Sequence, residues 1–190
     1  MRPAGPTLLL PWLVLALVIT SIASTAAEPP GSIRFVGKNA IATANGTFHA
    51  WKITGSKVDL SNLDTSFVEI EIDIASVDTA NKDRDDHLRT SDFFEVEKYP
   101  TARARLHSAA ATGKDGSGRS TYAVSIDVTI RGITNTVPGT FAVVSDSPLR
   151  VAGQLTINRV QWGIGAPEQR FNPMSIGNEI PIEFNATLVE

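Results

Sequence analysis

Apolar and polar side chains alternate along most of the chain with the period of a β-strand. In residues 67–74, Val68, Ile70, Ile72 and Ile74 alternate with Glu69, Glu71 and Asp73. A period of two puts the apolar side chains on one face of a strand and the charged ones on the other. The pattern returns in residues 122–130, with Tyr122, Val124, Ile126, Val128 and Ile130, and in residues 180–188, with Ile180, Ile182, Phe184, Ala186 and Leu188. These stretches predict half-buried strands.

Weaker alternation predicts further strands at residues 33–36, 47–53, 102–107 and 151–157. Between the first two, Asn45-Gly46 predicts a turn, because both residues tolerate positive φ. Several strands with turn-length gaps predict an all-β fold, either a barrel or a sandwich. The nine-residue strands favour a closed antiparallel barrel of about eight strands, whose interior is either packed or holds one small ligand.

One stretch departs from this pattern. Residues 81–89 are strongly charged, and their spacing predicts a short helix in which Asp85 and Arg89 form an i,i+4 ion pair. Phe93 and Phe94 follow. We interpret the segment as a helical lid across one end of the barrel, with the two aromatic rings folded down as a plug. An exposed connector held by its own ion pairs is an equal alternative.

The N-terminus has the features of an export signal. Arg2 precedes an apolar run over residues 8–19, and small residues suitable for cleavage follow at Ala26 and Ala27. The sequence thus predicts a signal peptide over residues 1–27, a linker over 28–32 and one domain over 33–190. We expect a periplasmic or secreted protein.

The composition of the chain limits the kinds of chemistry and of partner that we expect. The chain has 190 residues, a formal net charge of -3 and no cysteine. Disulfides and thiol chemistry are therefore excluded, and neither nucleic acid nor an anionic membrane surface is an expected partner at this weak negative charge. His49, His87 and His107 lack the spacing of a zinc site, and no nucleophile or phosphate-loop motif is present. We expect no metal, no cofactor and no catalysis, although a hydrolase or metal enzyme in the same barrel stays an alternative.

Several separate motifs resemble the YceI-like family. They are Ala75-Ser-Val-Asp-Thr79, Arg84-Asp85-x-His87-Leu88, Asp92-Phe93-Phe94, Tyr99-Pro100, the segment Val128–Thr134 and Trp162-Gly163-Ile164-Gly165. The resemblance covers residues 33–188. It implies a lipocalin-like barrel that binds a polyisoprenoid or similar amphiphile in an internal tunnel. The family commonly has Phe where Arg103 or Arg105 stands here. An inward arginine would make the tunnel more polar, and the sequence leaves its direction open.

With this resemblance, we expect an exported protein that carries or sequesters an isoprenoid lipid such as a quinone. Transient membrane contact and a homodimer are compatible with that role. A barrel with a filled core that acts through its surface is the remaining alternative. The side chains expected to contact lipid are Phe48, Trp51, Val68, Ile70, Ile72, Ile74, Phe93, Phe94, Tyr122, Val124, Ile126, Val128, Trp162 and Phe184. Those expected at the lid or the lipid head group are Arg84, Asp85 and His87, with ion pairs inside the lid as an equal alternative. The large aromatics could equally be plain core.

Overall fold

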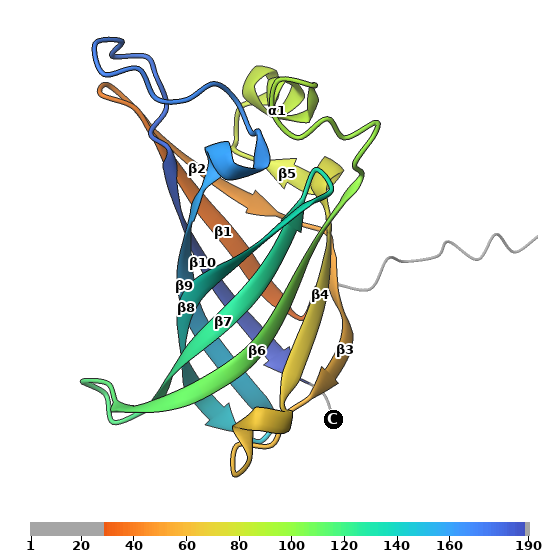
Figure 1. The fold of residues 1–190 in the computed structure, drawn as a ribbon, viewed down its shortest axis with the longest axis vertical. Helices are drawn as coiled ribbons and strands as arrows, with labels where there is room; N and C mark the ends of the chain where they lie inside the picture. The colour runs from red at the N-terminus through yellow and green to blue at the C-terminus, as the bar shows by residue number, and fades with distance from the viewer. Residues whose placement is uncertain (1–28, 189–190) are drawn as a thin grey trace, which may run out of the picture.

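Within the described part of the chain, ten strands form one antiparallel sheet that curls around an apolar interior (Figure 1). The structure is a computed structural model and describes residues 29–188. The predicted signal peptide, residues 1–27, lies outside the described residues. The all-β fold with a curled antiparallel sheet and a short helix is confirmed.

The sheet runs in the order β3-β4-β6-β7-β8-β9-β10-β1-β2-β5. Its strands are β1 (Gly31–Lys38), β2 (Thr43–Phe48), β3 (Trp51–Lys57), β4 (Phe67–Asp73), β5 (Val77–Asp78), β6 (Thr101–Lys114), β7 (Ser120–Ile130), β8 (Ile133–Asp146), β9 (Leu149–Asn158) and β10 (Glu179–Leu188). The helices are α1 (Lys82–Arg89) and the 3₁₀ turns η1 (Leu63–Thr65), η2 (Ile74–Ser76) and η3 (Arg159–Trp162).

The expected strand number of about eight was wrong. One reason is that residues 47–53, predicted as one strand, form two. The chain bends at His49-Ala50, so that β2 pairs with β1 and β5 whereas β3 pairs with β4. Around the bend, the amide of His49 donates to the carbonyl of Ser76 at 3.2 Å and the amide of Asp73 donates to that of Ala50 at 2.9 Å. These bonds bring the two edges of the sheet together at this corner.

The predicted turn at Asn45-Gly46 was also wrong, because both residues lie inside β2. The turn is instead made by Asn39, whose side-chain oxygen accepts from the amides of Ile41 and Ala42 at 3.0 and 2.8 Å. Gly46 is needed for packing: a Cβ there would lie 2.1 Å from the ring of Phe35 on the neighbouring strand. The glycine leaves room for an inward aromatic ring.

The first strand begins earlier than expected. β1 starts at Gly31, inside the predicted linker over residues 28–32, and Gly31 pairs with Ala186 of β10. The linker prediction relied on prolines and glycine, whereas backbone pairing with β10 decides where the strand begins.

Arg103 and Arg105 point outward, which answers the question that the sequence left open. Each lies directly opposite an outward glutamate of β4. The Arg103 guanidinium is 3.1 Å from the Glu71 carboxylate, and Arg105 pairs with Glu69. Hydrogen bonds first from Lys52 and then from Arg103 hold the pKa of Glu71 below its ordinary value. The arginines therefore leave the polarity of the interior unchanged.

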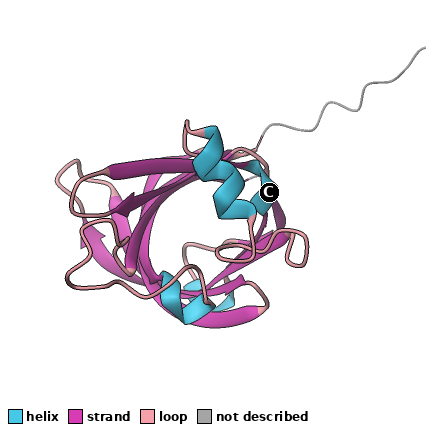
Figure 2. Cartoon of the chain, turned by 90° about the horizontal axis from the view of Figure 1, so that it is seen from above, coloured by secondary structure: helices cyan, strands magenta, loops and turns pink. Residues whose placement is uncertain are grey.

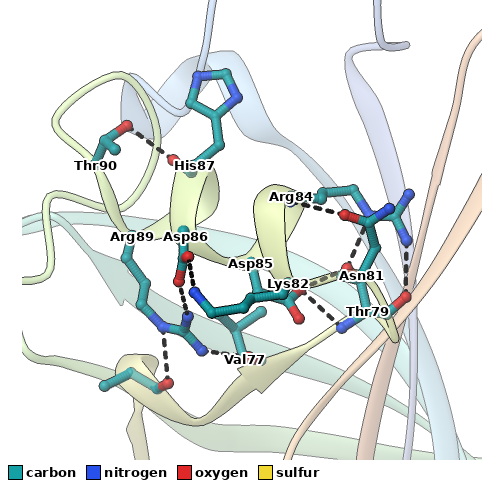
Figure 3. A network of polar contacts seen from close by, with 11 residues as sticks. Val77, Thr79, Asn81, Lys82, Arg84, Asp85, Asp86, His87, Arg89 and Thr90 are labelled. Carbon is teal, nitrogen blue, oxygen red and sulfur yellow. Dashed lines mark hydrogen bonds and ion pairs between the residues drawn. The ribbon is translucent and has the colours of Figure 1, made fainter.

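Helix α1 lies at one end of the barrel, above the ring of strands (Figures 1 and 2). The Asn81 side chain caps it by accepting from the Arg84 amide at 3.0 Å. Asp85 is buried and accepts from both the amide and the hydroxyl of Thr79 (Figure 3). Arg89 donates to the carbonyls of Ala75 and Val77 at 3.1 and 2.9 Å. Within residues 29–188, no helix is long and apolar enough to cross a membrane.

The expected Asp85–Arg89 ion pair was wrong. Asp85 faces the barrel, because its carboxylate binds Thr79, and Arg89 instead pairs with the exposed Asp86 at 3.1 Å. Asp86 also pairs with Lys82, and hydrogen bonding to Lys82 is the main cause that holds the pKa of Asp86 below its ordinary value.

We predict that Gly153→Ala destabilises the fold by about 1–3 kcal/mol, the range for an overpacked core. A Cβ at Gly153 would lie 2.4 Å from the Thr140 carbonyl oxygen and 2.5 Å from the Phe184 ring. Gly37→Ala is the control, because a Cβ there meets nothing within 4 Å. Urea denaturation of both variants measures the difference, and equal stabilities would contradict the prediction.

We predict that Asp85→Ala loosens α1. The substitution leaves the buried amide and hydroxyl of Thr79 without an acceptor, a cost of about 1–3 kcal/mol. Asp86→Ala on the exposed face should change stability much less. Hydrogen exchange of the α1 amides checks this. The anchoring role of Asp85 would be refuted by equal protection in the two variants.

Candidate functional site

A cavity of about 560 Å³ occupies the barrel interior at the end where α1 lies. Its lining is almost entirely apolar and comes from strands on all sides of the barrel, from α1 and from the Phe93-Phe94 turn. The volume lies within the range of about 300–1,000 Å³ that is typical of small-molecule sites. The inward face of the sheet is therefore only partly filled by its own side chains.

A second cavity of about 60 Å³ lies toward the other end, where Leu63 of η1 and Leu60 just before it contribute to its lining. Ile70, Leu106 and Phe184 line both cavities. These residues stand between the two spaces, so the apolar interior continues along the barrel past a constriction.

The Phe93-Phe94 turn closes part of the upper end. The Phe94 ring lies edge-on to Phe48 with centroids 6.1 Å apart, and Phe93 lies 4.9 Å from the His87 ring. Arg131 holds this turn in place. Its guanidinium donates to the carbonyls of Ser91, Phe93 and Gly163 at 3.1, 2.6 and 2.7 Å and pairs with Glu95 at 2.9 Å.

Arg159 is a buried cation in the cavity wall, with 4% of its surface exposed. It donates to the carbonyls of Gly177, Ile164 and Ile176 at 2.9, 2.6 and 2.7 Å. Burial lowers the pKa of Arg159, and the charge of Glu168 opposes that shift. The guanidinium thus fixes the segment after η3 through backbone carbonyls.

The other polar residues at the cavity belong to α1 and the residues before it, except Arg103 of β6, whose guanidinium is directed outward at Glu71. Arg84 lines the cavity but donates to the hydroxyl and carbonyl of Thr79 at 2.8 and 2.7 Å (Figure 3). His87 also lines the cavity, and its ring lies 3.7 Å from Asp92. Within residues 29–188, no three His, Asp or Glu side chains gather as a metal site would require.

The structure brings most of the expected lipid-contacting residues to the two cavities. The larger cavity is lined by Phe48, Ile70, Ile72, Ile74, Phe93, Phe94, Ile126, Val128 and Phe184. The smaller one is lined by Val68, Val124 and again Ile70 and Phe184. The period-two pattern thus indicated the inward face correctly.

Trp51, Tyr122, Trp162 and Asp85 line neither cavity. Trp162 is fully buried and its indole N–H donates to the Val128 carbonyl at 3.2 Å. Tyr122 stacks on Phe141 with centroids 4.9 Å apart, and Trp51 is buried in a core cluster with Ile33 and Val68. These rings are packed in the core and in the wall, because neighbouring side chains cover them.

Sequence reasoning missed much of the lining. The larger cavity also includes Ile33, Phe35, Ala44, Thr79, Asp83, Leu88, Ala102, Ala104, Leu106, Ile130, Leu155, Ile157, Arg159, Ile164, Ile176, Ile180 and Ile182. The strand residues among them share the alternation and could have been found from it. Arg131 stands inside a quoted motif and Arg159 three residues before one, but apart from Ile164 their carbonyl partners are remote in sequence.

Comparison with known proteins identifies the family. The model of the YceI-like domain matches residues 26–188. A UPF0312 protein of Pseudomonas savastanoi pv. phaseolicola is 30% identical over 130 residues, which cover 65% of this chain and 65% of that protein, just under two thirds of its length. A UPF0312 protein of Photorhabdus laumondii is 40% identical over 70 residues, covering 37% of this chain and 33% of the relative.

Solved structures share the fold. BcnA of Burkholderia cenocepacia has a TM-score of 0.73 at 23% identity, covering 84% of this chain and 96% of that one. A polyisoprenoid binding domain from Saccharophagus degradans has a TM-score of 0.57 at 14% identity, covering 82% and 91%. The Campylobacter jejuni YceI protein has a TM-score of 0.59 at 20% identity, covering 79% and 88%.

At such identities the solved structures show a shared fold alone. The family model, however, matches most of the chain, including every strand and the helix α1. This chain belongs to the YceI-like family.

Proposed function

We propose that this protein binds the hydrocarbon chain of a long amphiphile, of the polyisoprenoid or isoprenoid-quinone type, and carries or sequesters it without covalent chemistry. The observation that carries the proposal is the apolar cavity of about 560 Å³ inside the barrel. Its few polar side chains, such as Arg84 and Arg159, already bind backbone or hydroxyl groups of the protein. The interior therefore offers contact area to a hydrocarbon and few groups for chemistry.

Two further observations support a lipid over other ligands. The apolar interior continues past Ile70, Leu106 and Phe184 toward the second cavity, which suits an elongated chain. One structural neighbour is described as a polyisoprenoid binding domain. A solid core, the alternative left by the sequence, is not favoured, because inward side chains of the sheet line open space.

Energetics favour exchange with a membrane over capture from water. Burying about forty hydrocarbon carbons from water at about 0.8 kcal/mol each would release about 30 kcal/mol. That value exceeds the ceiling of about 18–21 kcal/mol on non-covalent affinity. In a membrane the chain is already out of water, so moving it into the barrel is close to neutral. A protein that carries a lipid or holds it in reserve requires this near-equality of free energy between membrane and barrel.

We further propose export, on the pattern of residues 1–27. The mature protein is expected to begin after Ala26 or Ala27 and to fractionate with the periplasm or the medium. Intact-mass measurement of the protein from its own host, together with cell fractionation, checks both points. An N-terminus that retains residues 8–19 would contradict cleavage.

Native mass spectrometry of the protein from its own host, followed by lipid extraction, tests the binding proposal. We expect a stoichiometric long-chain lipid. A protein that carries none, and takes up none from isoprenoid-loaded vesicles, would refute the proposal.

We predict that Ala104→Phe abolishes lipid occupancy while the barrel stays folded. Ala104 lines the cavity beside Ile70 of the adjacent strand β4, so the added ring fills the space that the ligand would use. Arg105→Phe is the matched control, because Arg105 lines neither cavity and pairs with Glu69, so that the same ring is placed on the outer face of β6. Native mass spectrometry reports occupancy and thermal melting reports folding. Equal occupancy in both variants would rule out the cavity as the lipid site.

A further inference from the structure

The barrel exposes large apolar side chains at the end that holds the larger cavity. Phe171 is 93% exposed, Ile41 is 68% exposed and Met174 is 61% exposed. An exposed apolar group of this kind marks a site of contact with a membrane or another macromolecule when its members gather in one place. Ile41, Phe171 and Met174 are called the loop patch below.

Hydrogen bonds hold the members of the loop patch side by side. Ile41 lies in the connection between β1 and β2, and the other two lie in the segment between η3 and β10. The Ala40 amide donates to the Pro173 carbonyl at 3.2 Å, and the Asn39 side chain donates to the Met174 carbonyl at 3.4 Å. Both connections stand at the same end of the barrel as α1 (Figure 1).

The loop patch carries cations at its border. The Arg170 guanidinium lies 5.9 Å from the Phe171 ring centroid, and Lys38 is exposed at the end of β1. Glu168 lies in the same segment and accepts from the Asn178 amide at 3.4 Å, and the exposed Glu179 follows at the start of β10. Apolar tips beside Lys or Arg are the composition that binds the interface of an anionic bilayer.

The same two connections border the cavity. Gly37 and Ala44, on either side of the β1–β2 connection, line it, and so does Ile176, two residues after Met174. The Gly177 amide donates to the Lys38 carbonyl at 2.8 Å and joins the connections there. A lipid that leaves the cavity near these residues would emerge beside the loop patch.

We infer that the loop patch is the surface by which the protein docks on an anionic phospholipid bilayer, with Phe171, Met174 and Ile41 inserted among the lipids and Arg170 and Lys38 at the head groups. The inference rests on the proposed lipid-carrier function and says where on the protein the lipid is exchanged with the membrane. Docking by this end sets the cavity against the bilayer, so the hydrocarbon passes between the two without crossing water.

The absence of cysteine in the chain makes a site-specific test direct. Phe171→Cys, Ile41→Cys and Val144→Cys are each labelled with an environment-sensitive fluorophore. Val144 is the control: it is 45% exposed and lies near the end of β8 remote from α1. Vesicles of phosphatidylethanolamine and phosphatidylglycerol are added to the full exported chain, with the same N-terminus in all variants. Native mass spectrometry measures lipid occupancy in parallel.

We expect a blue shift and quenching by brominated lipids at positions 171 and 41, and neither at position 144. No shift at 171, or equal shifts at all three positions, would overturn the docking surface. So would a shift that appears on raising the protein concentration without vesicles, because a second copy would then cover the patch. If the protein carries lipid but the labels do not respond to vesicles, the docking surface is wrong and the proposed function stands. If the protein carries no lipid, the proposed function itself is contradicted.

Discussion

The cavity end of the barrel depends on arginine side chains that bind backbone carbonyls. The strands pair with one another, but the segments that cover this end are irregular, and their buried carbonyls need donors from elsewhere. Arg89 supplies them to the residues around η2 and β5, Arg131 to the Phe93-Phe94 turn and Arg159 to the segment after η3. A guanidinium suits this task because its donors spread in a rigid fork and reach several acceptors at once.

This arrangement explains how a charged segment can cover an apolar cavity. The segments that cover the cavity end are α1, the Phe93-Phe94 turn and the residues after η3. The arginines that fix them donate to the protein's own backbone carbonyls, and the Asp85 carboxylate accepts from Thr79. The cavity consequently keeps an almost wholly apolar wall, although charged residues stand along its upper end. The hollow also has a physical cause: small inward residues such as Ala102, Ala104 and Gly37 lie between larger ones, so the side chains of the sheet do not fill its interior.

Much of the fold could be predicted from local pattern. Alternation in β4, β7 and β10 indicated the strands and their inward faces, and the charge spacing of residues 81–89 indicated α1. The failures came where remote packing decides. Asn45-Gly46 has the composition of a turn, yet the ring of Phe35 requires a glycine inside a strand there. Trp162 and Tyr122 are large aromatics that were expected near the ligand, and the structure places both outside the two cavities.

The sequence by itself determined the all-β class, the face of each clear strand, the helix α1 and the family, because these depend on periodicity and on motifs that are local in the chain. Only the tertiary structure decided that the interior is hollow, that Arg103 and Arg105 point outward, and that Arg131 and Arg159 fix the cover. These features depend on which strands become neighbours around the barrel. The volume left between side chains and the partner of each buried donor arise from residues far apart in the chain, and no local pattern encodes them.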